Sequence, residues 1–241
     1  MLLSAELTEM GFGPWDLEAL IFFVLAWISY TLIADHSPLQ RRSISFAMAR
    51  QRRQWMQQAA HRELRMIDTG VISNLITGIS FFASTTIFVI GGLIAALGYT
   101  SELASAFQAI PLASDLTAEQ GAIRLTVLLV IFIYAFFKFA WALRLDNYCS
   151  ILVGGFDNLD NADPLALDKR AAAASEINTL SGYHFNRGIR GYFFALAVVG
   201  WFIHPLLFVL DTIAVMLILV RREFSSKAAR AVWALTTEFN S

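Results

Sequence analysis

The sequence predicts an all-α fold: an integral membrane helical bundle with four spans and amphipathic cytoplasmic helices. Of its 241 residues, 57% are hydrophobic and only 15% are charged, whereas about a quarter of the residues are charged in soluble domains. The apolar residues gather in long runs, and a helix needs about 20 such residues to cross a bilayer. We therefore expect residues 1–241 to form a single integral membrane domain.

The first span covers residues 15–34, "WDLEALIFFVLAWISYTLIA". No lysine or arginine precedes it, whereas seven arginines follow it in segment 36–68. Cytoplasmic loops carry the excess of positive charge, so we expect segment 36–68 to be cytoplasmic and the N-terminus to lie outside. Met48, Trp55 and Met56 recur at helical spacing between the arginines. This predicted helix either lies at the membrane surface with its basic face toward anionic headgroups, or packs on its neighbours in the cytoplasm.

The second span covers residues 71–97, and small or weakly polar residues form a stripe along it. The stripe consists of Gly70, Asn74, Thr77, Gly78, Ser84, Gly91 and Ala95. Small residues let helix backbones approach closely in lipid, so we interpret the stripe as a helix–helix seam; the alternative is a ligand path. The loop that follows contains Glu102, Asp115 and Glu119 but no basic residue, which suits the outer side of the membrane.

The third span covers residues 123–143, with Arg124 at its outer end and Lys138 about one turn from its inner end. Both long side chains can snorkel to the interface. The alternative for Lys138 is a functional charge inside the membrane. The helix is expected to continue into a second cytoplasmic segment, residues 144–190.

The last apolar stretch, residues 191–220, allows two folds. Its 30 residues would form a helix of about 45 Å, with His204-Pro205 near the middle, where proline kinks or breaks a helix. Length favours one long, kinked helix that places the C-terminus outside. Charge favours a hairpin that returns the tail to the cytoplasm, because basic residues follow the stretch. These are Arg221, Arg222, Lys227 and Arg230. We expect the single kinked helix.

Three segments together resemble a known family. They are "FKFAWALRLDNYCSILVG" (Phe137 to Gly154), "HFNRGIRGYFFALAVVGWFIHPLLF" (His184 to Phe208) and "RREFSS" (Arg221 to Ser226). They resemble the bacterial and plant membrane proteins of domain of unknown function 599, over most of the chain. The resemblance implies a multi-spanning membrane protein, and it brings no established activity and no catalytic residues.

Polar residues gather where the third span ends. The cluster consists of Lys138, Arg144, Asp146, Asn147, Tyr148 and Cys149. It either marks the helix exit, with Arg144 at lipid phosphates and Tyr148 in the aromatic belt, or forms a site. Arg144 and Tyr148 are an i, i+4 pair. Cys149 is expected to be buried and inert; as a nucleophile it would need a base, for which His184 is the candidate.

A second polar cluster, "HFNRGIR", precedes the last apolar stretch. It holds His184, Asn186, Arg187 and Arg190. Two arginines and a histidine at a helix entering the bilayer suit a phosphate of a lipid or of another ligand. Positive-inside anchoring explains the arginines equally well.

His204 and Asp211 form a third candidate, seven residues apart on one face of the predicted helix. Ionisable groups inside a membrane point to function by default, so the pair could relay protons. The alternative is local: His204 satisfies carbonyls freed by Pro205, and Asp211 pairs with Arg124.

The sequence contains no nucleotide-binding loop, metal motif or catalytic-triad spacing, so we expect no metal, no cofactor and no nucleic-acid partner. The leading hypothesis is a non-enzymatic accessory or scaffold module of the bacterial inner membrane. It would bind anionic lipid headgroups and pack through small-residue seams against itself or another membrane protein. The alternatives are a small oligomeric transporter or ion- or proton-conducting protein that uses Lys138, His204 and Asp211, and a membrane enzyme that acts on lipid.

Overall fold

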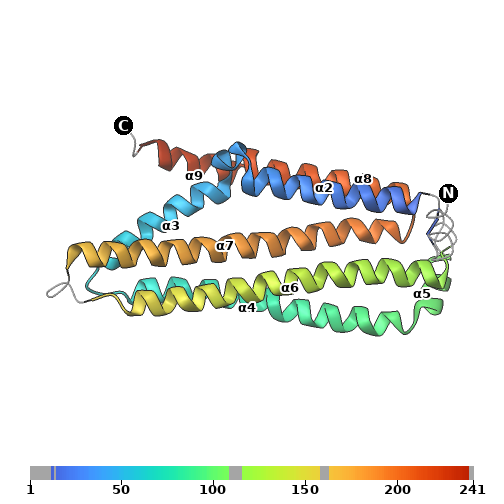
Figure 1. Ribbon diagram of the computed structural model, residues 1–241, viewed down its shortest axis with the longest axis horizontal. Helices are drawn as coiled ribbons and strands as arrows, with labels where there is room; N and C mark the ends of the chain where they lie inside the picture. The colour runs from blue at the N-terminus through green and yellow to red at the C-terminus, as the bar shows by residue number, and fades with distance from the viewer. Residues whose placement is uncertain (1–11, 14, 109–115, 158–162, 239–241) are drawn as a thin grey trace. The chain divides into compact units, whose positions relative to one another are not determined.

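The computed structural model describes residues 12–13, 15–108, 116–157 and 163–238, and this part of the chain folds into helices without strands. The all-α prediction is therefore confirmed (Figure 1). In chain order the elements are α2 (Asp16–His36), the 3₁₀ turn η1 (Pro38–Arg42), α3 (Ile44–Ala60), α4 (Met66–Leu97), α5 (Thr100–Gln108), α6 (Ala118–Gly154), α7 (Pro164–Trp201), α8 (Pro205–Val220), the π-helical turn η3 (Arg221–Ser225) and α9 (Lys227–Glu238).

Among the described residues, three helices are long and apolar enough to cross a membrane: α2, α4 and α6. They match the first three predicted spans, with α2 beginning one residue after the first of them, which supports a multi-pass membrane protein. The helix α6 has 37 residues and continues beyond the predicted span, as expected. The predicted fourth span is not among the three, because it is divided between α7 and α8, and α8 has only 16 residues.

The chain divides into two compact units, and the long helices α4, α6 and α7 each contribute residues to both. Unit 1 comprises the described residues within Met1–Ser37, Thr86–Ala135 and Ile189–Arg221. Its core is aromatic: the Trp201 and Phe208 rings stack with centroids 4.8 Å apart. Both are almost completely buried, so burial of large rings is a major source of stability in this unit.

Within unit 1, the last apolar stretch forms two helices, and our expectation of one kinked helix is wrong. The helix α7 ends at Trp201 and α8 begins at Pro205, and α8 turns back alongside the end of α7 (Figure 1). A Cβ atom on Gly200 of α7 would overlap the carboxylate of Asp211 on α8, which shows how closely the two arms pack. The two arms differ in kind. One arm is the short helix α8, whereas the other is the end of α7, which runs as one continuous helix from Pro164 onward.

Unit 2 comprises Pro38–Thr85, Phe136–Gly188 and the described residues within Arg222–Ser241. The helix α3 buries Met56, Ala59 and Ala60 in a core with residues of α4, α6 and α7. The helix in segment 36–68 is therefore packed on its neighbours. Its arginines also have internal roles: the Arg65 guanidinium donates to the carbonyl oxygens of Phe156 and Asp157.

The C-terminal helix α9 also lies in unit 2, against α3. The Trp233 indole donates to the Arg42 carbonyl oxygen at 3.2 Å and stacks on Phe46. Before α9, the carboxylate of Glu223 in η3 accepts a hydrogen bond from the backbone N–H of Ser45. These contacts place the tail beside the arginine-rich segment, as the hairpin alternative requires.

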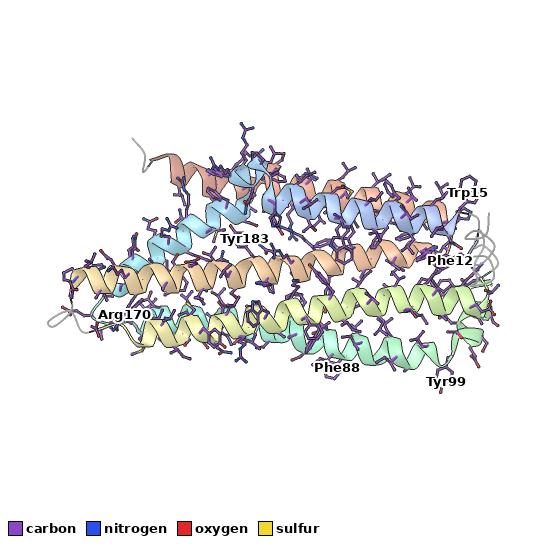
Figure 2. The ribbon with its side chains drawn as sticks, viewed as in Figure 1. Phe12, Trp15, Phe88, Tyr99, Arg170 and Tyr183 are labelled. Carbon is purple, nitrogen blue, oxygen red and sulfur yellow. The ribbon has the colours of Figure 1, made fainter. Side chains whose placement is uncertain are left out.

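The small-residue stripe of α4 faces open space in the structure. A Cβ atom added to Gly70, Gly78 or Gly91 would meet nothing within 4 Å. Large apolar side chains lie between the small ones on this helix, and Figure 2 shows Phe88 on its outer side, where 79% of the residue is exposed. These three glycines therefore make no close contact with another described helix of their own unit.

Candidate functional site

A buried polar cluster of unit 1 is centred on the Asp16 carboxylate at the start of α2. It accepts hydrogen bonds from the Trp201 indole at 2.6 Å, the Arg124 guanidinium at 3.3 Å and the Gly13 backbone at 2.8 Å. Asp16 and Arg124 are 4% and 2% exposed. Arg124 was expected to snorkel or to pair with Asp211, and it pairs with Asp16 instead. The cluster joins three helices and has a structural role.

A second buried ion pair in unit 1 involves Arg190, one of the predicted phosphate ligands. Its guanidinium donates to the Asp35 carboxylate at 2.8 Å and lies over the Tyr30 ring. Both charged side chains are almost fully buried. Arg190 thus has a carboxylate partner inside the protein.

In unit 2, Lys138 of α6 and two residues of α7, His184 and Arg187, form a basic cluster. His184 Nδ1 is buried without a hydrogen-bond partner, and the ring packs edge-on against Trp141 with centroids 6.4 Å apart. Burial, then the positive charges of Lys138 and Arg187, lower the pKa of His184 to about 4. His184 is therefore neutral at pH 7 and can donate one N–H group, while its two neighbours supply positive charge.

The other two predicted phosphate ligands lie apart from this cluster. The Asn186 amide donates to the Ser45 hydroxyl at 3.1 Å, so it joins α7 to α3. Arg144 is exposed, and it donates to the Tyr148 hydroxyl at 2.6 Å and lies over the Tyr148 ring. The predicted i, i+4 pair is thus confirmed.

Cys149 is completely buried, as predicted, and its thiol donates to the Ala174 carbonyl oxygen. His184 lies ten residues further along α7, about 15 Å away along the helix axis. The two residues are therefore not arranged as a nucleophile and its base.

The structure does not bring His204 and Asp211 together. His204 is the N-cap of α8, where its Nδ1 accepts a hydrogen bond from the Leu206 backbone N–H at 3.1 Å. His204 therefore has a local role, but the expectation that it satisfies carbonyls freed by Pro205 is wrong, because the ring accepts from a backbone N–H group. Asp211 packs against Gly200, and no hydrogen bond or ion pair joins these two described ionisable residues.

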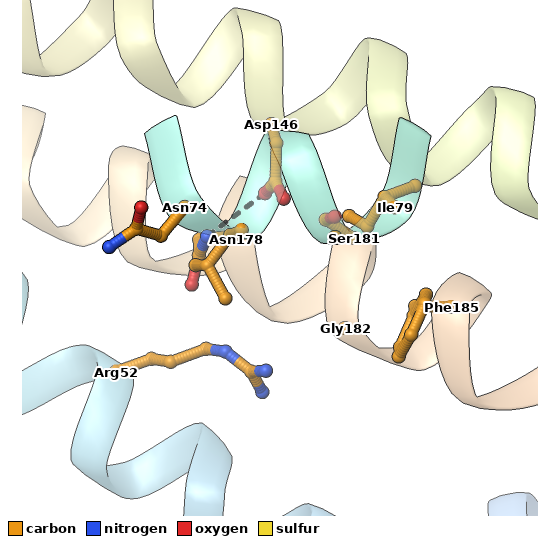
Figure 3. A pocket seen from close by; sticks show the side chains of 10 residues that line it. Arg52, Asn74, Ile79, Asp146, Asn178, Ser181, Gly182 and Phe185 are labelled. Atoms are coloured by element: carbon orange, nitrogen blue, oxygen red, sulfur yellow. Dashed lines mark hydrogen bonds between the residues drawn. The ribbon is translucent and has the colours of Figure 1, made fainter. Parts of the chain in front are cut away.

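A cavity of about 150 Å³ in unit 2 contains Asp146 of the first predicted polar cluster, together with Arg52 and Asn178, which sequence reasoning did not connect with it (Figure 3). Its polar wall includes Asp146 of α6 and Asn178 of α7, each 1% exposed. The Asn178 Nδ2 donates to the Asp146 carboxylate at 2.9 Å. The Ser181 hydroxyl, one turn further along α7, donates to the Ala142 carbonyl oxygen.

The opposite wall of this cavity carries Arg52 of α3, whose guanidinium points toward Gly182 (Figure 3). Burial lowers the pKa of Arg52, whereas the negative fields of Asp146 and then Tyr183 raise it. An arginine stays protonated in proteins, so the Arg52 guanidinium shares the cavity with the Asp146 carboxyl group. Burial raises the pKa of Asp146, whereas hydrogen bonds from Ser181 and Asn178 and the positive charge of Arg52 favour its carboxylate form. The sequence signal for this site was the i, i+3 spacing of Asn178 and Ser181 in an otherwise alanine-rich helix.

Among the described residues, no group of three or more His, Cys, Asp or Glu side chains could hold a metal ion. The chain matches the family described as "Protein of unknown function, DUF599" over residues 18–228. The protein belongs to this DUF599 family. The predicted resemblance is thereby confirmed, and the match includes every residue of the basic cluster and of the cavity. No curated protein and no solved structure matches the chain significantly.

Proposed function

We propose that this DUF599 protein is a non-enzymatic membrane module that binds the phosphate of an anionic lipid through Lys138, His184 and Arg187. The convergence of these three side chains from α6 and α7 carries the proposal. A phosphate offers acceptor oxygens, and charge-assisted hydrogen bonds from arginine and lysine are about twice as strong as neutral ones. The neutral His184 ring adds a donor without adding to the charge repulsion.

The proposed arrangement in the bilayer places this cluster at the inner leaflet of the bacterial inner membrane. The helices α2, α4 and α6 cross the membrane, and the end of α7 and α8 form a hairpin whose turn approaches the outer face. Two facts support this: His204 at the turn lines the same cavity as Trp15 at the start of α2, and Asp35 neutralises Arg190 on the α7 arm. The N-terminus then lies outside and the C-terminus inside, as the positive-inside rule favours.

An accessory or scaffold role fits the way in which the other intramembrane charges are arranged. Asp16 pairs with Arg124, and Asp35 pairs with Arg190, so these groups stabilise helix packing. The exposed small-residue stripe of α4 offers a surface on which a second membrane protein or another copy of this chain could pack closely. Lipid binding beside such a surface would anchor an assembly at the inner leaflet.

The test compares lipid binding by matched arginine variants. Purified wild-type protein, Arg187→Gln and Arg170→Gln are mixed with phosphatidylglycerol, and the bound lipid is measured by native mass spectrometry. Arg170 lies on the same helix, is exposed and donates to the Gly155 carbonyl oxygen, so its variant has the same change in net charge. Loss of a charge-assisted hydrogen bond predicts about tenfold weaker binding for Arg187→Gln alone.

Equal binding by Arg187→Gln and Arg170→Gln would contradict the proposed site. A third variant, Lys138→Gln, extends the test to the second helix. It should weaken phosphatidylglycerol binding to a similar degree, and it should leave the weak binding of phosphatidylcholine, which has no net charge, unchanged.

A further inference from the structure

The cavity of unit 2 contains polar groups whose hydrogen-bonding capacity is not used by the protein. The Oδ1 atom of Asn178 is buried and has no hydrogen-bond partner. The described residues also provide no hydrogen bond to the Arg52 guanidinium, which has only electrostatic interactions with Asp146 and Tyr183. A buried polar atom without a partner is unfavourable, so Asn178 Oδ1 indicates an occupant of the cavity, and the half-buried Arg52 guanidinium is available to the same occupant.

The position of Arg52 depends on a glycine on the facing helix. A Cβ atom at Gly182 would lie 2.5 Å from one guanidinium nitrogen and 2.7 Å from the central carbon. Any side chain at this position would therefore displace the guanidinium. Gly182 lets Arg52 extend into the cavity opposite Asp146 and Asn178 (Figure 3).

The charges of the cavity define what it can hold. One guanidinium and one carboxylate give a net charge of zero, and burial of an uncompensated charge is very unfavourable. A ligand that is itself neutral overall is therefore favoured over a simple anion or cation. Arg52 favours an anionic acceptor. The unpartnered Asn178 Oδ1 requires a donor, and the neighbouring Asp146 carboxylate, which accepts from Asn178 Nδ2, favours a donor that carries a positive charge, such as an ammonium group.

We propose that this cavity binds a small zwitterionic group, with its acid on Arg52 and its ammonium between Asp146 and Asn178. The site is separate from the Lys138–His184–Arg187 cluster and does not depend on the function proposed for it. A cavity of about 150 Å³ admits a molecule as large as benzene. This size suits the ethanolamine phosphate headgroup of a phospholipid or a small free amino acid, which share this chemistry.

The cavity opens along α4, one of the helices that could cross the membrane. Asn74, Leu75 and Gly78 of α4 line it and are exposed. A Cβ atom at Gly78 would meet nothing within 4 Å, so the missing side chain leaves an entrance on this side. A lipid headgroup would enter through this opening, whereas a free amino acid need not.

The test uses the full chain in nanodiscs of phosphatidylethanolamine or phosphatidylcholine, followed by native mass spectrometry of the released protein. The two lipids differ in that the choline ammonium has no N–H donor for Asn178 Oδ1. In parallel, the melting temperature is measured with glycine and with ethanolamine phosphate. The variants are Arg52→Gln, Gly78→Phe at the entrance and Arg53→Gln, the matched control that removes the same charge one residue away, outside this cavity.

We expect wild-type and Arg53→Gln to retain phosphatidylethanolamine, and Arg52→Gln to retain at least about tenfold less. Loss of the lipid in Gly78→Phe as well would identify the headgroup as the ligand. If no lipid is retained but glycine or ethanolamine phosphate raises the melting temperature of every variant except Arg52→Gln, the ligand is soluble.

Two results would overturn the proposal. One is a wild-type protein that neither retains phosphatidylethanolamine over phosphatidylcholine nor responds to either soluble zwitterion, since the cavity would then hold only water. The other is an equal effect of Arg52→Gln and Arg53→Gln. The comparison of the two lipids on the wild-type protein decides the matter even if Arg52→Gln does not fold.

Discussion

Removal of the Asp16 carboxylate should destabilise unit 1 strongly. Asp16 accepts hydrogen bonds from Trp201, Arg124 and Gly13, and Arg124 is 2% exposed. The substitution Asp16→Ala leaves the Arg124 charge buried without its counter-ion, which typically costs about 3–5 kcal/mol. For a chain of this length, that corresponds to a melting temperature about 6–20 °C lower.

The assay is thermal unfolding of the detergent-purified protein, followed by the loss of soluble, monodisperse material. Glu18→Ala is the matched control, because it removes an exposed carboxylate two residues away on the same helix. A double variant, Asp16→Leu with Arg124→Met, should recover much of the loss, since a well-packed apolar pair often replaces a buried ion pair at little cost. A melting temperature for Asp16→Ala equal to that of Glu18→Ala would refute the buried-pair reasoning, and so would a double variant less stable than Asp16→Ala.

Three further predictions concern packing and pH. Phe208→Ala should destabilise the protein by about 3–5 kcal/mol, because Phe208 is 0% exposed; a loss below about 1 kcal/mol in chemical unfolding would contradict the aromatic core. Gly188→Ala should destabilise the protein by about 1–3 kcal/mol, because the new Cβ would lie 2.5 Å from the Phe139 ring. The control Gly70→Ala, at an open position, should be neutral or slightly stabilising. Equal melting temperatures for these two variants would contradict the prediction. The pKa of His184 is about 4 in the folded protein and 6.5 ordinarily, so the unfolded chain binds more protons between these two pH values. The stability of the protein should therefore rise with pH through this window and then level off. An identical pH profile of the melting temperature for wild-type protein and His184→Gln would contradict this prediction.

The local features of the sequence predicted most of the helices and some single contacts. Long apolar runs predicted α2, α4 and α6, and the four-residue spacing of Arg144 and Tyr148 predicted their hydrogen bond. These inferences succeeded because helix length and side-chain periodicity depend only on neighbouring residues.

Features that depend on packing between distant segments could not be predicted in this way. Arg124 was assigned to the interface because its partner, Asp16, lies 108 residues earlier in the chain. Sequence reasoning rejected the hairpin because it assumed that each arm needs about 20 apolar residues of its own. The α7 arm instead includes the charged residue Arg190, and Asp35, which is distant in the sequence, neutralises it. The cavity was missed because Asn178, when considered alone, resembles any polar residue of a solvated helix.

The side of the membrane on which the C-terminal helix lies tests the account most directly, because the hairpin and the inner-leaflet lipid site both depend on it. Single cysteines at Ala228 in α9, Gln58 in α3 and Ala106 in α5 are labelled in intact cells with an impermeant thiol reagent; all three positions are exposed, whereas the native Cys149 is buried. We predict that only Ala106→Cys reacts in intact cells and that the other two react after the membrane is opened. Labelling of Ala228→Cys in intact cells, with Gln58→Cys still protected, would show that the last apolar stretch crosses the membrane once and would contradict the account.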